Sequence, residues 1–381
     1  MSAMRSSGNS DIPTSERSKL FSRRTAVLGL LGFLGSGVVL ALNWRKFDRS
    51  VAQVGTPEGQ KYLGTHCRAV LEIAFSPDGR FLASGGVEGT VKLWDLATGE
   101  ERATLTRHTG PVEAVAFAPD GNTLVSGGGH KDGTVRLWDI RSGAQRTLFN
   151  IVPPVGTTIT TRYVAFSPDG RTVASGSEIN TGDHHLAGPL ILWDINTGQQ
   201  LYQGQILALA RRAIAFTPDG KYLVVKGKGI RLIEVATGKE QAALEREGDG
   251  GLLGFGISSD GKTLVSLYVL DLWSKIPREL HQTVVLWDLA TYQPGASFTL
   301  PKAVDPAHSV AFSHDGKILA TAGQDSYVRL WALPTGMELA SFKGPGGLIN
   351  AVCFSPDDKT IAFACDNGAV LLAEIKQPPG Q

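Results

Sequence analysis

A six-residue segment recurs seven times along the chain and constrains its fold more than any other feature. Its copies are AFSPDG at 74–79, AFAPDG at 116–121, AFSPDG at 165–170, AFTPDG at 215–220, GISSDG at 256–261, AFSHDG at 311–316 and CFSPDD at 353–358. The spacing between successive copies is 41 to 55 residues. Repeats of this length are typical of stacked structural units, each too small to bury its own apolar face.

The sequence of one repeat predicts four short strands. Residues 70–75 are apolar and lead into Ser76-Pro77-Asp78-Gly79, where proline fixes φ and glycine accepts a positive φ, as a tight turn requires. Further strands are expected at 80–84, 90–94 and 102–105. Four antiparallel strands in each of seven repeats predict an all-β, seven-bladed β-propeller over residues 60–376.

Trp-Asp pairs close the third strand of four repeats and carry a family resemblance. They are Trp94-Asp95, Trp138-Asp139, Trp193-Asp194 and Trp287-Asp288. Together with the repeat length, they make residues 58–376 resemble the WD-repeat propeller family. That resemblance implies a hydrogen-bonded tetrad within each blade, and the second repeat matches it in full with His108, Ser126, Asp132 and Trp138. The alternative is resemblance to the periplasmic propeller of the Tol system, whose repeats also carry Ser-Pro-Asp-Gly; the Trp-Asp pairs favour the WD-repeat family.

The N-terminal region predicts a targeting segment. Residues 1–21 are rich in serine and charge and are expected to form a disordered head. In segment 22–46, Ser22-Arg23-Arg24 precedes an uncharged apolar run at 26–42. This resembles a twin-arginine export signal, and a single transmembrane anchor is the alternative. A buried core helix is disfavoured because the run has no polar stripe. The protein is therefore expected to be membrane-anchored or periplasmic and exported, with 47–59 as a linker.

The seventh repeat lacks a fourth strand. It ends at Ile375, and the Pro-Gly-rich tail at 377–381 is too short to supply one. Residues 60–63 lie where a fourth strand would precede the first repeat. We therefore expect this segment to complete the last blade and close the ring, which would remove an exposed sheet edge.

Charge and cysteine content exclude some functions. Beyond residue 50 the chain holds 29 basic and 33 acidic residues, so it lacks the basic surface of a general nucleic-acid binder. Cys67, Cys353 and Cys365 lie in or beside apolar strands and are expected to be buried thiols, with a disulfide between the first and last blades as the alternative. The propeller is expected to be a monomer.

Length variation predicts a binding face. Insertions fall at 151–161, 178–189 and 268–282, all on connections that emerge on one side of the propeller. Loops on a rigid scaffold commonly carry binding residues, so we expect a protein or peptide partner there. The predicted partner-binding residues are Tyr268, Trp273, Lys275, Arg278 and Glu279 in one insertion, and Asp183, His184 and His185 in the other.

Two chemical functions are disfavoured. Asp183, His184 and His185, with His130 in a neighbouring loop, are a weak candidate metal site because they lack a fixed ligand spacing. The blade-two tetrad contains the members of a nucleophilic triad, but catalysis needs an exposed nucleophile. We expect no cofactor and a non-enzymatic scaffold. The alternative is a hydrolase or lyase with a site at the central channel, which would need convergent titratable groups.

Overall fold

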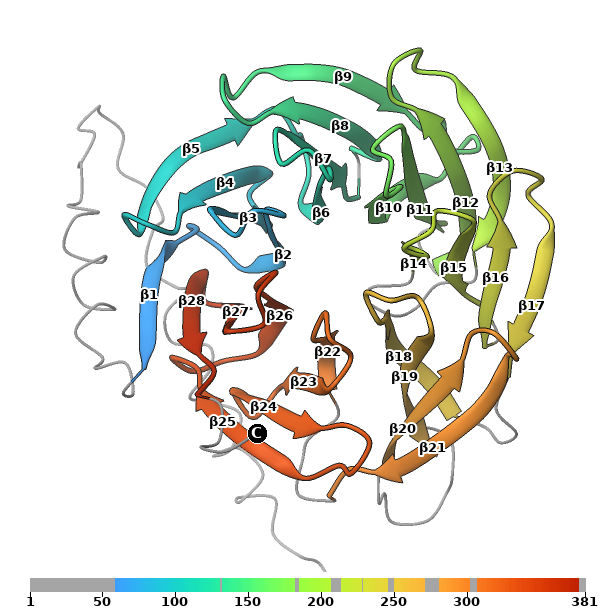
Figure 1. Cartoon of the computed structure of the whole chain (residues 1–381). Coiled ribbons are helices and arrows are strands. Elements are labelled where there is room, and N and C mark those ends of the chain that lie inside the picture. Colours follow the sequence, from blue (N-terminus) through green and yellow to red (C-terminus); the bar gives the residue numbers. More distant parts are fainter. Residues whose placement is uncertain are drawn as a thin grey trace, which may run out of the picture. The chain divides into compact units, whose positions relative to one another are not determined.

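Seven four-stranded antiparallel sheets surround a central opening (Figure 1). The computed structural model describes residues 59–130, 132–181, 185–206, 214–227, 229–245, 250–270, 281–301 and 307–376. Within these ranges all regular elements are strands. The predicted seven-bladed all-β propeller of four-stranded antiparallel blades is confirmed, whereas the N-terminal apolar helix, also part of the predicted fold class, lies outside the described residues. The predicted head, targeting segment and tail lie outside the described residues. None of the residues described forms a helix long and apolar enough to cross a membrane.

The blades follow the chain in order, each running from an inner to an outer strand. Blade one contains β2 (Val70–Phe75), β3 (Phe81–Gly86), β4 (Thr90–Asp95) and β5 (Glu100–Thr106); blade two contains β6 (Val112–Phe117), β7 (Thr123–Gly128), β8 (Thr134–Asp139) and β9 (Gln145–Asn150). Blade three contains β10 (Thr158–Phe166), β11 (Thr172–Asn180), β12 (His185–Asp194) and β13 (Gln200–Ile206); blade four contains β14 (Ile214–Phe216), β15 (Tyr222–Lys226), β16 (Ile230–Glu234) and β17 (Glu240–Leu244). Blade five contains β18 (Gly250–Ile257), β19 (Thr263–Leu270), β20 (His281–Asp288) and β21 (Gln293–Thr299); blade six contains β22 (Ala307–Phe312), β23 (Ile318–Gly323), β24 (Tyr327–Ala332) and β25 (Glu338–Lys343). Blade seven contains β26 (Ile349–Phe354), β27 (Thr360–Cys365), β28 (Ala369–Glu374) and β1 (Gln60–Thr65).

The first strand closes the ring by joining the last blade. β1 pairs antiparallel with β28, from Gln60 opposite Ala373 to Thr65 opposite Ala369. The backbone N–H of His66 then donates to the carbonyl oxygen of Gly368 at 2.9 Å. The predicted closure by the segment before His66 is confirmed, and it gives the third strand of blade seven a hydrogen-bonded neighbour on both sides.

Each recurrent turn is held by its own side chains, which explains why its sequence repeats. In the first turn the Ser76 hydroxyl donates to Asp78 Oδ1 at 2.6 Å and accepts the N–H of Phe81 at 2.9 Å. Gly79 has φ of 67°, a conformation that strains other residues. The hydrogen bond from Ser76 is the main reason that the pKa of Asp78 lies below its ordinary value.

Neighbouring turns touch around the ring and form what we call the turn collar, residues 76–79 and their six equivalents. Glycine in one turn leaves room for the proline of the preceding blade: a carbon added at Gly121 would lie 3.9 Å from Pro77 Cδ, and one added at Gly79 would lie 3.8 Å from Pro356 Cδ. Blades five and six have no proline here. Instead the Ser259 N–H donates to the carbonyl oxygen of His314 at 3.0 Å. The collar is thus continuous through packing at some joints and hydrogen bonds at others.

Apolar side chains fill the interfaces between blades. Trp94 of blade one, for example, packs in one cluster with Ala351 and Cys353 of blade seven. Cys353 and Cys365 are buried thiols as predicted, and burial raises the pKa of Cys365 to about 12. The prediction is wrong for Cys67, which is exposed because it follows the end of β1; all three cysteines are free.

Candidate functional site

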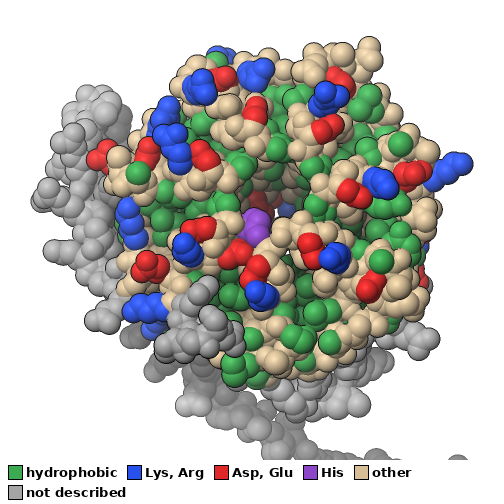
Figure 2. Space-filling model, viewed as in Figure 1, with side chains coloured by type: hydrophobic (Ala, Val, Ile, Leu, Met, Phe, Trp, Pro, Cys, Tyr) green, Lys and Arg blue, Asp and Glu red, His purple; other side chains and the backbone are tan. Residues whose placement is uncertain are grey.

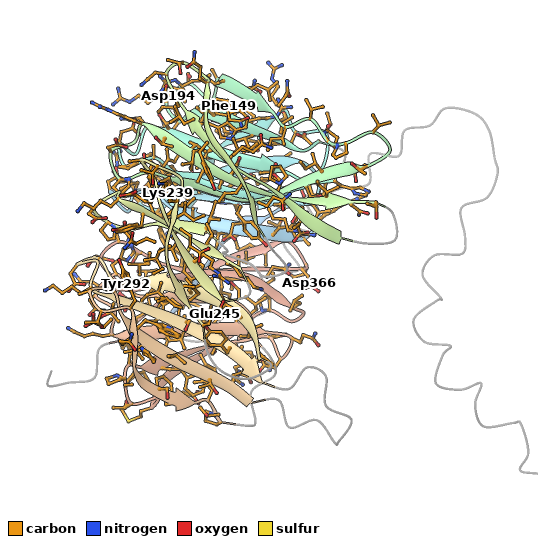
Figure 3. The ribbon with its side chains drawn as sticks, turned by 90° about the vertical axis from the view of Figure 1, so that its right-hand side faces the viewer. Phe149, Asp194, Lys239, Glu245, Tyr292 and Asp366 are labelled. Carbon is orange, nitrogen blue, oxygen red and sulfur yellow. The ribbon has the colours of Figure 1, made fainter. Side chains whose placement is uncertain are left out.

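The propeller presents two faces with different connections. The turn collar and the turns between third and fourth strands lie on one side, which we call the turn face. The other two kinds of connection form the opposite side, the insert face. In Figure 3 Asp194, Lys239 and Tyr292 of the turn face lie at the left, whereas Asp366 of the insert face lies toward the right.

In blade two the four residues of the predicted tetrad form one buried network. Trp138 Nε1 donates to Ser126 Oγ at 2.8 Å, and Ser126 Oγ lies 2.6 Å from His108 Nε2. His108 Nδ1 lies 3.2 Å from Asp132 Oδ2. Ser126 is completely buried between the indole and imidazole rings, so its hydroxyl has no access to a substrate. The network joins β7, β8, the loop between them and the loop that precedes the blade, which is a supporting role.

Asp132 is the charged member of this network, and its carboxylate is held by hydrogen bonds within the blade. Burial alone would raise the pKa of Asp132, but the hydrogen bonds with His108 and Thr134 outweigh it and hold the pKa well below its usual range. The Asp132 side chain has no solvent exposure. The carboxylate is therefore ionised and fully occupied within the blade.

Blade one builds the same network with a longer acid. His66 Nδ1 pairs with Glu88 Oε1, and His66 Nε2 lies 2.7 Å from Ser84 Oγ. Trp94 Nε1 donates to the same hydroxyl at 2.8 Å. Glu88 thus takes the place that aspartate has in blade two.

Only the indole-to-hydroxyl part persists in three further blades. Trp193 donates to Ser175 and Trp287 to Ser266, both at 2.8 Å, and Trp331 donates to Thr321 at 2.9 Å. Blades four and seven replace both groups: Val225 and Ile233 take these positions in blade four, Phe363 and Ala373 in blade seven. Removing donor and acceptor together leaves no unsatisfied group in the core.

Most of the predicted partner-binding residues cannot be placed. Asp183, His184, Trp273, Lys275, Arg278 and Glu279 lie outside the described residues, and only the backbone of His185, the first residue of β12, is described. His130 is exposed, with φ of 48°, and its N–H donates to Thr160 Oγ1 at 2.9 Å. Across the ranges that the structure describes, no three His, Cys, Asp or Glu residues are grouped to hold a metal.

The prediction that Tyr268 binds a partner at the surface is wrong. Its side chain is 4% exposed and packs in the core between blades four and five with Leu252 and Trp287. It is buried because β19 continues as regular strand to Leu270, which turns Tyr268 into the blade interface. The sequence-based boundary placed it in a loop.

Two of the insertions lengthen hairpins. In blade three β11 and β12 extend outward through the pairs Glu178–Ala187, Ile179–Leu186 and Asn180–His185. In blade five the ladder continues to Leu270 opposite His281. These blades therefore project a rigid ribbon from the insert face where the sequence predicted loops.

The third insertion, before β10, exposes two apolar side chains. Val152 and Val155 are 86% and 104% exposed, on either side of Pro153 and Pro154. The segment is ordered by Thr157, whose N–H and hydroxyl both donate to the carbonyl oxygen of Pro154, at 3.1 and 2.7 Å. A tight turn thus holds Val155 in solvent. Since β10 begins at Thr158, opposite Asn180 of β11, this turn lies beside the extended hairpin.

Arg162 is a charged residue beside the channel that was not predicted from the sequence. Arg162 is the extra residue of a β-bulge between the pairs Thr161–Ser177 and Tyr163–Gly176. Its Nε pairs with Glu178, and its NH1 lies 3.2 Å from Glu113 of blade two. The only signal in the sequence was one arginine within an apolar strand.

The central channel is a cavity of about 580 Å³. Ile73, Phe75, Phe312 and Phe354 are among its lining residues, and Glu72, Arg162 and His314 are charged or titratable groups that line it. Arg162 is neutralised by its two glutamates, while His314 lies in the turn collar, six strand positions away and on the order of 20 Å along the channel. Arg162 and His314 are therefore too far apart along the channel to act together on one substrate group.

Seven four-stranded blades, the Trp-Asp strand ends and the indole–hydroxyl–imidazole networks together define a WD-repeat β-propeller. Residues 69–374 match the family model described as the IFT122 first beta-propeller, and the chain belongs to this family. Membership confirms the WD-repeat resemblance over the Tol-type alternative. Proteins of such propeller families are generally protein-interaction scaffolds.

Curated relatives share only part of their length with this chain. The mouse transducin beta-like protein 3 is 38% identical over 144 residues, which are 36% of this chain and 16% of that protein. WD repeat-containing protein SL1-17 of Schistosoma mansoni is 29% identical over 155 residues, 40% of this chain and 46% of the relative. The rice guanine nucleotide-binding protein subunit beta is 25% identical over 197 residues, half of each chain. The chain thus spans half or less of these relatives.

Proposed function

We propose that this protein is a non-enzymatic, monomeric scaffold that binds a protein or peptide through the insert face at blade three. The observation that carries the proposal is the pair of solvent-exposed valines, Val152 and Val155, on an ordered turn beside the extended β11–β12 hairpin. Single exposed apolar residues are common on protein surfaces, but two such residues held in place by a tight turn form a prepared contact.

The surrounding geometry supports this choice. Gly156 has φ of 80°, which completes the turn, and the rings of Pro153 and Pro154 fix two φ angles and so limit the conformational freedom that the segment would lose on binding. The neighbouring hairpin adds backbone and side-chain surface above the ring. A partner that covers both features would bury apolar area on a rigid base, where contacts contribute most to affinity.

A membrane location is the second part of the proposal. The uncharged run at 26–42 behind Ser22-Arg23-Arg24 supports a tether or an export signal for segment 22–46. The propeller would then act at a membrane or in the compartment beyond it. Sequencing of the mature N-terminus distinguishes a cleaved signal from a retained anchor.

The binding face can be tested by site-specific crosslinking. A photoreactive amino acid at position 155 should crosslink a partner in native cells, whereas the same group at Leu201, which is 57% exposed on an outer strand, should not. The double variant Val152→Ser, Val155→Ser should lose the partner in affinity capture. The matched control, Leu201→Ser with Met337→Ser, removes exposed apolar side chains elsewhere and should keep it. Retention of the same partner by the first variant would refute the proposal.

A further inference from the structure

A groove between blades one and two opens on the turn face, away from the surface proposed above. Its volume is about 410 Å³, and three arginines line it. Arg80 follows the first collar turn, Arg102 lies in β5, and Arg141 lies in the turn between β8 and β9. Figure 2 views this face, with Lys and Arg side chains gathered over blades one and two at upper left.

None of the three guanidinium groups has a carboxylate partner among the described residues. Arg80 and Arg102 instead lie over the ring of Phe81, with Cζ atoms 5.4 and 5.0 Å from its centroid. Arg141 Nε donates to the amide oxygen of Asn122 at 3.1 Å. The groups are therefore ordered by an aromatic ring and an amide rather than by ion pairs.

Equivalent positions in three other blades provide an internal comparison. The residue at the Arg80 position is lysine in blades four to seven, and three of these lysines pair with their own turn aspartate: Lys262 with Asp260 at 3.9 Å, Lys317 with Asp315 at 3.4 Å and Lys359 with Asp357 at 4.0 Å. Arg80 makes no such pair with Asp78. Its guanidinium lies over Phe81 instead.

Arg102 reaches the groove because of a bulge in β5. Leu93 pairs with Ala103 and Trp94 with Glu101, which leaves Arg102 as the extra residue. In blade two the bulge residue is also an arginine, but Arg146 donates to Thr123 Oγ1 at 3.1 Å. Only the blade-one bulge directs a guanidinium onto an aromatic ring in this groove.

Two aspartates also line the groove, and one oxygen of each accepts hydrogen bonds within its own turn. Asp78 Oδ1 accepts the Ser76 hydroxyl and the N–H of Arg80, at 2.6 and 3.0 Å. Asp120 Oδ1 accepts the N–H groups of Asn122 and Thr123, at 2.8 and 3.0 Å. These carboxylates hold their own turns, and three arginines against two aspartates leave the groove with a net positive charge.

We propose that this groove binds a phosphorylated side chain of a protein partner. Guanidinium groups donate pairs of hydrogen bonds that match the oxygens of a phosphoryl group, and three of them line this groove. A narrow groove between two blades suits a peptide segment. A membrane surface is disfavoured because the chain beyond residue 50 is acidic, with 33 acidic and 29 basic residues, and would repel an anionic bilayer.

Labelled peptide libraries test the proposal on the purified full-length chain. Three degenerate libraries carry a fixed phosphoserine, phosphothreonine or phosphotyrosine, and matched libraries lack the phosphate; binding is followed by fluorescence anisotropy. At least one phosphorylated library should bind tenfold or more tightly than its unphosphorylated match. The variant Arg80→Gln, Arg102→Gln should abolish this preference. Arg141→Gln, which leaves the Phe81 stack intact, should weaken it and provides a second test if the double variant does not fold.

The control is Arg171→Gln, which removes the arginine at the Arg80 position of blade three and should bind like the unmodified protein. Equal binding of phosphorylated and unphosphorylated libraries would overturn the proposal, as would an equal loss in Arg171→Gln. Phosphatidylcholine vesicles containing a phosphoinositide provide the last arm. Vesicle binding that Arg80→Gln, Arg102→Gln removes, without any phosphopeptide preference, would assign the groove to lipid. Because the groove lies on the turn face, the Val152 and Val155 variants should leave phosphopeptide binding unchanged, so the two proposals can fail separately.

Discussion

Asp358 of blade seven accepts a hydrogen bond from the backbone N–H of His314 in blade six, at 2.9 Å. The N–H of Asp315 donates to the other carboxylate oxygen at 3.0 Å. Elsewhere in the turn collar glycine stands at the Asp358 position and, in five blades, proline at the His314 position. Proline has no N–H to donate, so the blades that have proline here join the next turn by packing proline beside glycine. Between blades six and seven, His314 and Asp358 join the turns by hydrogen bonds instead.

We expect that proline can replace His314, and glycine can replace Asp358, only when both residues are changed together. Asp358 has φ of 56°, so Asp358→Ala keeps the strain and loses the hydrogen bonds, and we expect destabilisation of about 2 kcal/mol. Asp358→Gly relieves the strain and should cost about 1 kcal/mol less. In a double-mutant cycle measured by denaturant unfolding, His314→Pro with Asp358→Gly should be more stable than the sum of the single changes, by about 0.5–3 kcal/mol. Strict additivity would show that the joint is not a unit.

Ring closure by β1 predicts the effect of truncation. Deletion of residues 1–65 removes the outer strand of blade seven and exposes the backbone edge of β28, so we expect a lower melting temperature and self-association. The control is deletion of residues 1–58, which leaves β1 in place and should preserve the melt. Calorimetry and sedimentation velocity measure both outcomes. Identical behaviour of the two truncated chains would contradict the closure argument.

The blade-two network should make His108 more important than an exposed histidine. His108→Ala leaves the hydroxyl of Ser126 and the carboxylate of Asp132 without their imidazole partner in a buried site, at a cost of about 1–3 kcal/mol. His314, whose side chain is 52% exposed, is the matched control, and His314→Ala should cost about 0.5 kcal/mol or less. Chemical denaturation measures both, and equal losses would show that the network adds nothing.

Asp132 predicts an acid-dependent loss of stability. The folded-state pKa of Asp132 is lowered, since the hydrogen bonds of its network outweigh burial. Its contribution is therefore fully present above the ordinary aspartate pKa of about 3.9 and is lost as pH falls through the lower, folded-state pKa. The difference in unfolding free energy between the unmodified protein and Asp132→Asn should be constant from pH 7 to about 5 and should shrink below pH 4. A difference that does not depend on pH would contradict this assignment.

Lys226 predicts a further rise in stability with pH, in the alkaline range. Burial lowers the pKa of Lys226 to about 8, with Glu178 opposing the shift. Between that value and the ordinary 10.5 the unfolded chain binds more protons than the folded one, so stability should rise with pH in this window. Lys226→Met should remove this rise and be more stable at pH 7. Unfolding curves collected from pH 7 to 10 would reveal it, and parallel pH profiles for the two proteins would count against a buried amine.

Local patterns made the fold predictable. Strand alternation, the Ser-Pro-Asp-Gly turns and the Trp-Asp ends are signals within one repeat, so the expected strand at 70–75 has the same bounds as β2, and that at 80–84 differs from β3 by two residues or fewer at either end. Ring closure followed from counting strands in the last repeat. Cys67 and Tyr268 were misplaced because their burial depends on where a strand ends, which is the least reliable feature of a sequence pattern.

The candidate sites were harder to predict because they combine residues from different blades. Arg162 meets Glu113 only through a bulge and the packing of blade two on blade three. Arg102 and Arg141 are far apart in sequence and share a groove because adjacent blades converge. The insertions marked the correct regions in blades three and five, but their length could not show that they extend hairpins.

The pairing of β1 with β28 also governs when the molecule can be completed during synthesis. Gln60 leaves the ribosome early, whereas its partner Ala373 belongs to the final repeat. Blades one to six can each form as their own residues emerge, because their four strands are consecutive. Blade seven must wait until its own repeat has been translated, and β1 remains an unpaired strand throughout that interval. A nascent chain stalled before the last repeat would therefore be an open arc with two exposed ends, a natural substrate for chaperones.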